Sequence, residues 1–241
     1  MNDKSTTIME TIVKGSLQWD TLFRSIDPEK VFTESYPKFD RLHAEGDLSA
    51  LLDPSRPKVL IAGSRDLTLM EQTVIPVVMA HLAKNPAKPV IISGLAVGSD
   101  TIVHTTALSS GLATVAVLPT GLDTIYPACN KDLAKKMVST PGCALLTQFP
   151  ERTEPKVTNF LARNNTAALL SDLMIITFSK EKGGAMLTAT MMNLLERPVY
   201  ALPGRLNDEH SRGSNRLIAS GNATLLDNVN LKMLEILTVK R

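Results

Sequence analysis

The stretch 90–121, VIISGLAVGSDTIVHTTALSSGLATVAVLPTG, constrains the fold more than any other part of the chain. It places two β-branched runs that end in glycine, 90–94 and 115–121, on either side of a helix-length segment. This spacing is typical of a strand–helix–strand crossover, and small residues at the strand ends let a ligand approach the backbone. Free N–H groups at the start of such a helix favour an anion such as phosphate. Because tight turns need glycine with or without a ligand, an anion site and a purely structural turn both stay open at this point.

From residue 58 onward, strand-like and helix-like segments alternate along the chain. Strands are expected at 58–62, 89–93, 113–118, 143–147, 173–178, 198–202 and 223–226, with helices near 69–84, 98–110, 129–138, 159–170, 184–196 and 213–219. This order predicts a Rossmann-like, doubly wound α/β fold, in which helices cover both faces of a mostly parallel sheet. With 241 residues, 44% of them hydrophobic, the chain is long enough to bury such a core.

The first 55 residues differ from the rest. They show helical spacing around Leu17 and Leu22, several prolines and no alternating strand pattern. We therefore expect a short helical N-terminal arm over 1–55, followed by a Rossmann-like domain over 56–241.

Composition narrows the class of protein. The net charge is +2, so any nucleic-acid surface has to be local. Cys129 and Cys143 are too few for a disulfide framework and lack the close spacing of a zinc site. The first residues have no signal-peptide pattern, and no apolar run approaches a membrane span. These features predict a cytoplasmic protein with no membrane association, no metal and no cofactor.

Several predicted strands end in glycine-rich or basic loops. Because the carboxyl ends of parallel strands share one edge of the sheet, these loops should converge there. The convergence favours a phosphate-binding edge over a set of unrelated turns. The residues expected to bind phosphate from these loops and the helices behind them are Gly63, Ser64, Arg65, Ser93, Gly94, Gly98, Gly121, Lys182, Gly183, Gly184, Thr188 and Arg205. A β-branched residue at Gly98 is expected to block the ligand without unfolding the domain.

The helix near 159–170 adds polar and aromatic candidates. Arg163 and Asn164 offer donors to phosphate or base, although Arg163 could instead pair with an acidic neighbour. Phe160 could stack a base or pack in the core, two possibilities that the sequence leaves open. Asp100 and His104, one helical turn apart, could form an acid–base pair. We favour the alternative that Asp100 binds backbone amides while His104 packs beneath the glycine loop.

Six ordered motifs between Gly63 and Leu226 resemble those of the DprA/Smf family: SGLAVGSDTIVHTTAL, TVAVLPTGLDTIYPACNKDL, NFLARNNTAALLSDLMII, GGAMLTA, RPVYALPG and GSNRLIASGNATLL. This resemblance implies a Rossmann-like fold, binding of single-stranded DNA, self-association into dimers and transfer of the DNA to the RecA recombinase during DNA processing and uptake. The family's Arg-Asn-Arg segment is Arg163-Asn164-Asn165 here, so one arginine of the implied DNA pocket is lost. We therefore expect weakened DNA binding.

The main competing class is a nucleotide-processing enzyme. Phosphoribohydrolases of the LOG type have a superficially similar glycine motif that is followed by a catalytic glutamate. The segment 182–188 keeps the glycines and the threonine, but Met191 and Met192 occupy the place of the acid. A dinucleotide oxidoreductase would need an acidic residue where Ser93 ends the second strand. The sequence thus favours a DNA-binding protein that is not an enzyme.

Overall fold

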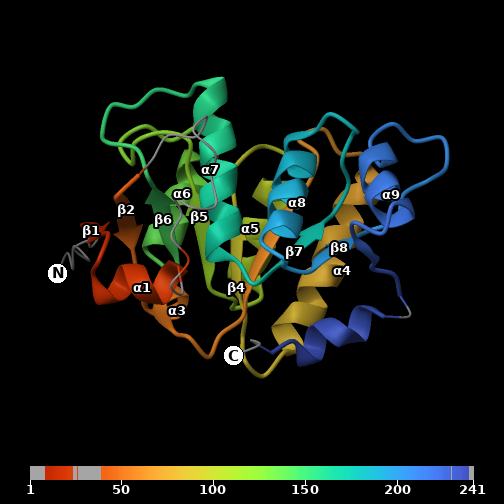
Figure 1. Cartoon of the computed structure of the whole chain (residues 1–241), viewed down its shortest axis with the longest axis horizontal. Coiled ribbons are helices and arrows are strands. Elements are labelled where there is room, and N and C mark those ends of the chain that lie inside the picture. Colours follow the sequence, from red (N-terminus) through yellow and green to blue (C-terminus); the bar gives the residue numbers. More distant parts are fainter. Residues whose placement is uncertain (1–8, 24–25, 27–38, 229, 239–241) are drawn as a thin grey trace.

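The computed structural model describes residues 9–23, 26, 39–228 and 230–238, whose strands form one mixed sheet (Figure 1). Its strand order is β1-β2-β6-β5-β4-β3-β7-β8-β9. The parallel strands are β3 (Lys58–Ala62), β4 (Val90–Ser93), β5 (Thr114–Val117), β6 (Ala144–Thr147), β7 (Leu173–Ile176), β8 (Val199–Ala201) and β9 (Thr224–Leu225). Each falls within a strand predicted from the sequence, and the Rossmann-like, mostly parallel fold class is confirmed.

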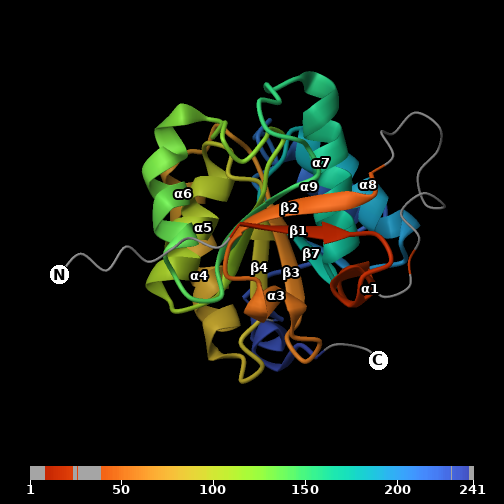
Figure 2. The ribbon, with the colours of Figure 1, turned by 90° about the vertical axis from the view of Figure 1, so that its left-hand side faces the viewer.

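The central strands are buried on both faces because helices cover both. On one face lie α4 (Leu69–Lys84), α5 (Ser99–Ser109), α6 (Lys131–Val138), which follows the short 3₁₀ turn η1 (Ala128–Asn130), and the 3₁₀ segment η2 (Leu231–Ile236). On the other lie α1 (Leu17–Phe23), α3 (Ser49–Leu52), α7 (Val157–Leu170), α8 (Gly184–Leu194) and α9 (Arg212–Ala219). Figure 2 shows the two helical layers on either side of the strands. This arrangement explains why the strands consist of hydrophobic runs rather than alternating patterns.

Two strands near the N-terminus were not expected. The predicted arm does contain helix α1, which buries Trp19, Leu22 and Phe23. It also contains β1 (Met9–Val13) and β2 (Arg41–Gly46), which pair with each other in antiparallel fashion. Because β2 also pairs with β6, the described part of the arm extends the main sheet. The boundary at residue 55 stays a prediction, and residues 1–8, 24–25 and 27–38 of the arm lie outside the described residues.

The order in which the chain adds strands to the sheet reverses between the parallel neighbours β3 and β7. From β3 the chain proceeds through β4, β5 and β6 on one side, whereas β7, β8 and β9 continue on the other. The chain leaves β3 toward α4 on one face and leaves β7 toward α8 on the opposite face. The two loops therefore diverge at the carboxyl edge and open a crevice, which is where ligands bind in sheets of this kind.

Candidate nucleic-acid interface

A crevice of about 560 Å³ opens at this switch point. Its walls come from the loops after β3 and β7 and from the starts of α7 and α8. The volume is in the usual range of ligand sites. Nine of the predicted site residues line it: Gly63, Ser64, Arg65, Phe160, Arg163, Asn164, Gly183, Gly184 and Thr188. We call this space the switch crevice.

A smaller cavity of about 130 Å³ adjoins the switch crevice. Gly94 lines it, together with Val97, Tyr126 and Pro127. Arg65, Phe160 and Arg163 line both cavities and so form the wall between them. A chain of nucleotides crossing this wall would place neighbouring units in two separate spaces.

The wall combines cationic and aromatic groups. The exposed Arg65 guanidinium carbon lies 5.1 Å from the centre of the Phe160 ring, within the range of cation–π attraction. The Tyr126 ring meets Phe160 edge-to-face at 5.6 Å between centroids and is 40% exposed. Phe160 is half-buried and lies outside the hydrophobic clusters formed by buried residues of the described chain. These observations favour the surface-stacking interpretation of Phe160 over the core interpretation.

Arg163 makes backbone contacts that the sequence did not predict. Its side chain is buried, and Nη1 donates to the carbonyl oxygens of Gly94 and Val117, the latter at 2.8 Å. The guanidinium thus joins the loop after β4 to the end of β5. The acidic pairing considered from the sequence is replaced by these carbonyl contacts. Arg163 shapes both cavities, but part of its hydrogen-bonding capacity is committed to the protein itself.

Asp100 balances this buried cation. Burial raises the pKa of Asp100, while the positive charge of Arg163 acts in the opposite direction. Burial likewise lowers the pKa of Arg163, and Asp100 opposes that shift. The Asp100 carboxylate accepts the Ala96 N–H at 3.1 Å. Asp100 therefore fixes the loop after β4, as the favoured interpretation predicts.

His104 is fully buried beneath the same loop. Its Nδ1 lies 2.8 Å from the Thr114 hydroxyl, which itself donates to the carbonyl oxygen of Ile91. The hydroxyl oxygen is thereby free to accept from Nδ1–H. The pKa of His104 is lowered to about 3, first because burial disfavours the charged ring and second because Arg163 adds positive charge. A ring that stays neutral and sealed from solvent packs beneath the loop and does not act as an acid–base partner.

The lowered pKa of His104 predicts a pH-dependent stability. The unfolded ring has a pKa near 6.5, so as the pH falls the unfolded chain takes up the proton first. The contribution of the neutral His104 ring to the free energy of unfolding is fully present above pH 6.5. It is lost as the pH falls from 6.5 to about 3, at about 1.4 kcal/mol per pH unit. Between pH 7 and pH 5, the parent should lose about 2 kcal/mol more unfolding free energy than His104→Leu. Urea titrations at both pH values measure this, and equal losses in the two proteins would contradict it.

The glycine loop after β4 is filled by the protein. A Cβ at Gly94 would lie 1.9 Å from Arg163 Nη1. A Cβ at Gly98 would lie 2.5 Å from the carbonyl oxygen of Arg65. The Ser99 N–H, at the start of α5, donates to the carbonyl oxygen of Ser64. This loop therefore receives the backbone of residues 64–65 where the sequence suggested a bound phosphate.

Five predicted residues lie away from both cavities. Ser93 is buried and donates to the carbonyl oxygen of Ile61, so it holds two strands together. Gly98 contacts the Ser64–Arg65 backbone, and Gly121 donates to the carbonyl oxygen of Thr153. Neither cavity has Lys182 in its lining, and Arg205 lines a different pocket. Position after a parallel strand was therefore not sufficient to place a residue in either cavity.

Among the lining residues that the sequence-based prediction omitted, Lys180 and Tyr126 have side chains suited to binding a nucleotide. Lys180, in the loop after β7, lines the switch crevice, and its Nζ lies 4.0 Å from Asp66 Oδ2. Tyr126 is presented by the loop before η1. Lys180 belongs to the basic loop 179–184 that follows a predicted strand. Tyr126 belongs to the motif that contains TIYPACN. An aromatic residue next to proline in a polar loop was the available signal for Tyr126.

The geometry gives no support to the phosphoribohydrolase alternative. Met191 and Met192 are buried in the core against the sheet. Glu196 follows the C-terminal end of α8, whereas Gly183 and Gly184 line the crevice at its N-terminal end. In the described part of the chain, the carboxylates that line the crevice are Asp66 and Asp100.

A search of the described helices for a membrane span found none with the necessary length and apolar character.

The fold and the crevice together define a Rossmann-like protein with a ligand-sized opening at its switch point. The model of the family described as DNA recombination-mediator protein A matches residues 28–237. DNA processing protein DprA of Bacillus subtilis is 33% identical over 216 residues, covering 88% of this chain and 67% of that protein. The chain belongs to the DprA/Smf family.

Solved structures agree with this assignment. DprA from Streptococcus pneumoniae superposes with a TM-score of 0.79 at 28% identity, covering 97% of this chain and 75% of the other. DprA from Helicobacter pylori, whose structure concerns its single-stranded DNA binding mode, gives a TM-score of 0.75 at 29% identity, covering 94% and 95%. The alignments span between 34% and 67% of the length of the curated relatives.

Proposed function

We propose that this chain binds single-stranded DNA in the switch crevice as a DNA-processing protein, without enzymatic activity of its own. The observation that carries the proposal is the wall of Arg65 and Phe160, with Tyr126 beside it, between two adjoining cavities. Aromatic rings stack bases regardless of sequence, and an adjacent guanidinium attracts the phosphate. The structural relative described as a single-stranded DNA binder supports the same ligand.

The site residues have distinct parts in this proposal. Arg65 and Lys180 contact phosphates, while Asn164 and the backbone at Gly183 and Gly184 supply further donors. Phe160 stacks a base, and Tyr126 borders the neighbouring cavity. Arg163 acts mainly by holding the loops that form the wall. Asp66 and Asp100 also line the crevice, which limits its net positive charge.

This limited charge predicts a shallow salt dependence. Three or four phosphate contacts on a single strand, at about 0.7 counterions each, give a log–log slope of about −2 to −3. The expected affinity is micromolar or weaker. Fluorescence anisotropy with labelled oligodeoxythymidylate between low and moderate salt measures the slope. A slope steeper than about −6 would place the DNA on another, more basic surface.

Replacing Phe160 by alanine tests the stacking role. Single-strand affinity should fall by roughly 1–3 kcal/mol, which is the contribution of one stacked base. Folding stability should change little, because the ring is half-buried and outside the buried core. Phe149→Ala is the matched control, since Phe149 is also half-buried but lines neither cavity. A loss of stability with unchanged affinity per folded molecule would return Phe160 to the core interpretation.

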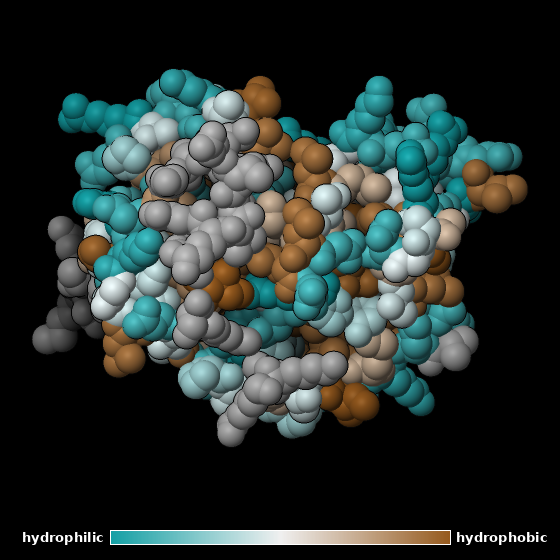
Figure 3. All heavy atoms as spheres, in the orientation of Figure 1, coloured by the Kyte–Doolittle hydropathy of each residue, from teal (hydrophilic) through white to brown (hydrophobic). Residues whose placement is uncertain are grey.

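The proposal extends to partners and location. We propose a cytoplasmic homodimer that transfers its DNA to the RecA recombinase during DNA uptake or processing. Figure 3 shows hydrophobic side chains gathered along the middle of one face of the molecule. Leu187 and Leu194 of α8 are among the exposed large hydrophobic residues. Such surface suits contact with another protein, and sedimentation velocity with and without RecA tests both associations.

A further inference from the structure

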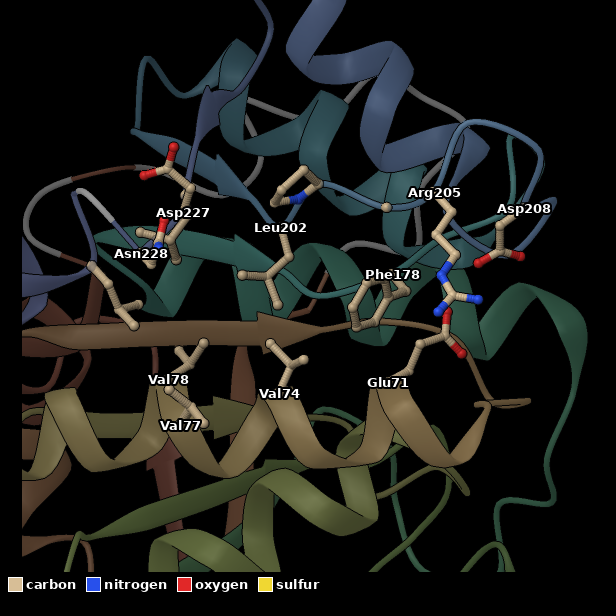
Figure 4. Close-up of a pocket in the computed structure, with 14 residues that line it drawn as sticks. Glu71, Val74, Val77, Val78, Phe178, Leu202, Arg205, Asp208, Asp227 and Asn228 are labelled. Atoms are coloured by element: carbon tan, nitrogen blue, oxygen red, sulfur yellow. The ribbon is translucent and has the colours of Figure 1, made fainter.

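A second pocket lies apart from the switch crevice and shares none of its lining residues. Its volume is about 540 Å³, and it lies between α4 and the chain segments that follow β7, β8 and β9 (Figure 4). Branched aliphatic side chains of α4 form one side, and Phe178 and Leu202 form the other. We call it the α4 pocket.

The α4 pocket arises from an incomplete helical layer. On this face, α4 covers the centre of the sheet, and the short segment η2 packs against it. Helix α9, which follows β8, buries Leu217 in the cluster on the opposite face. The sheet edge beside α4 is thus left with an apolar hollow of ligand size.

A buried carboxylate faces one end of the hollow. Glu71 lines the pocket and is only 2% exposed. Its Oε2 accepts the Thr68 N–H at 2.6 Å as part of the capping box that starts α4. Its Oε1 has no hydrogen-bond partner among the described residues. In Figure 4 the side chain extends from α4 toward Arg205, next to Phe178. A buried acceptor without a donor is costly, so a ligand that supplies one is favoured.

The charges of the lining define the sign of that ligand. Glu71, Asp208 and Asp227 contribute carboxylates, and Arg205 contributes one guanidinium. This balance opposes a phosphate-bearing ligand and attracts a cation. The apolar walls require the cation to carry a hydrophobic body.

We propose that the α4 pocket binds a small organic cation, with an aromatic or branched aliphatic body between α4 and Leu202 and an amidinium or ammonium group donating to Glu71 Oε1. Such a ligand satisfies the unpartnered acceptor and fills the hollow. The site is independent of the DNA crevice in both position and charge.

Three isosteric probes test the chemistry: benzamidine, neutral benzamide and anionic benzoate. Ligand-detected NMR titration should give saturable binding in the order benzamidine, benzamide, benzoate. Glu71→Gln keeps a carbonyl oxygen for the capping box, which accepts glutamine at this position, and turns the second oxygen into a donor. Benzamidine binding should then weaken at least tenfold, in line with loss of a charged hydrogen bond, and benzamide should bind at least as well as benzamidine. An unchanged thermal melt verifies that α4 remains formed.

A blocking variant locates the site. Val77→Trp places a large side chain at the pocket from an exposed position of α4 and should abolish benzamidine binding. Leu17→Trp, at an exposed position of α1, is the matched control and should bind like the parent. Both should bind single-stranded DNA normally, so failure here is distinguishable from failure of the DNA proposal. Equal binding of benzamide and benzamidine to the parent, absence of saturation, or binding that survives Val77→Trp would overturn the proposal.

Discussion

Replacing Arg163 by alanine is expected to lower the free energy of unfolding by about 3–5 kcal/mol, the usual cost of removing one member of a buried charged network. The variant leaves the carbonyl oxygens of Gly94 and Val117 without this donor. It also leaves the buried Asp100 carboxylate without the positive charge that offsets its burial. Equilibrium urea unfolding at pH 7 measures the loss.

A surface arginine provides the comparison for this variant. Arg212→Ala, at the exposed start of α9, should change stability by no more than about 0.5 kcal/mol. Arg163→Lys should recover only part of the loss, because an ammonium is more strongly hydrated than a guanidinium and is therefore more costly to bury. If Arg163→Ala kept full stability and lost only DNA affinity, the guanidinium would act mainly by contacting DNA and not by stabilising the fold.

Replacing Gly98 by valine is expected to cost about 3–5 kcal/mol of folding stability, from backbone strain together with overpacking. Gly98 has φ +79°, a conformation that β-branched residues avoid. The added Cβ would also meet backbone atoms of Ser64 and Arg65 at 2.5–2.6 Å, and backbone cannot rotate away as a side chain can. This corrects the sequence-based expectation that such a change would block a ligand and spare the fold.

Gly111 separates the two contributions to that cost. It has φ +68° but open space around the position of a Cβ. Gly111→Val should therefore show only the conformational part, about 1–2 kcal/mol. Thermal and urea unfolding of both variants should rank Gly98→Val as the more destabilised by at least about 2 kcal/mol. Equal losses would mean that the loop of residues 64–65 moves aside easily.

The parallel core was predictable because its signal is local. Runs such as Val90–Ser93 and Leu173–Ile176 are hydrophobic throughout, as strands buried on both faces must be. Strand β2 buries Leu42 and Ala44 but also contains the charged residues Arg41 and Glu45. Such a short alternating strand gains its stability from pairing with β1 and β6, which are separate in the sequence. The sequence pattern therefore did not reveal it.

The sequence by itself determined that glycine-rich and basic loops gather at one edge of a parallel sheet, because strand direction follows from the alternation of elements. Only the tertiary structure decided which of their side chains share a cavity. The Arg65 guanidinium lies over the Phe160 ring, Arg163 donates to backbone carbonyls, and Arg205 lines the α4 pocket. The physical reason is that the direction of a side chain depends on the face of the sheet to which the chain crosses after each strand. It also depends on which nearby backbone carbonyl oxygens lack a hydrogen-bond donor. Both are set by packing between distant segments.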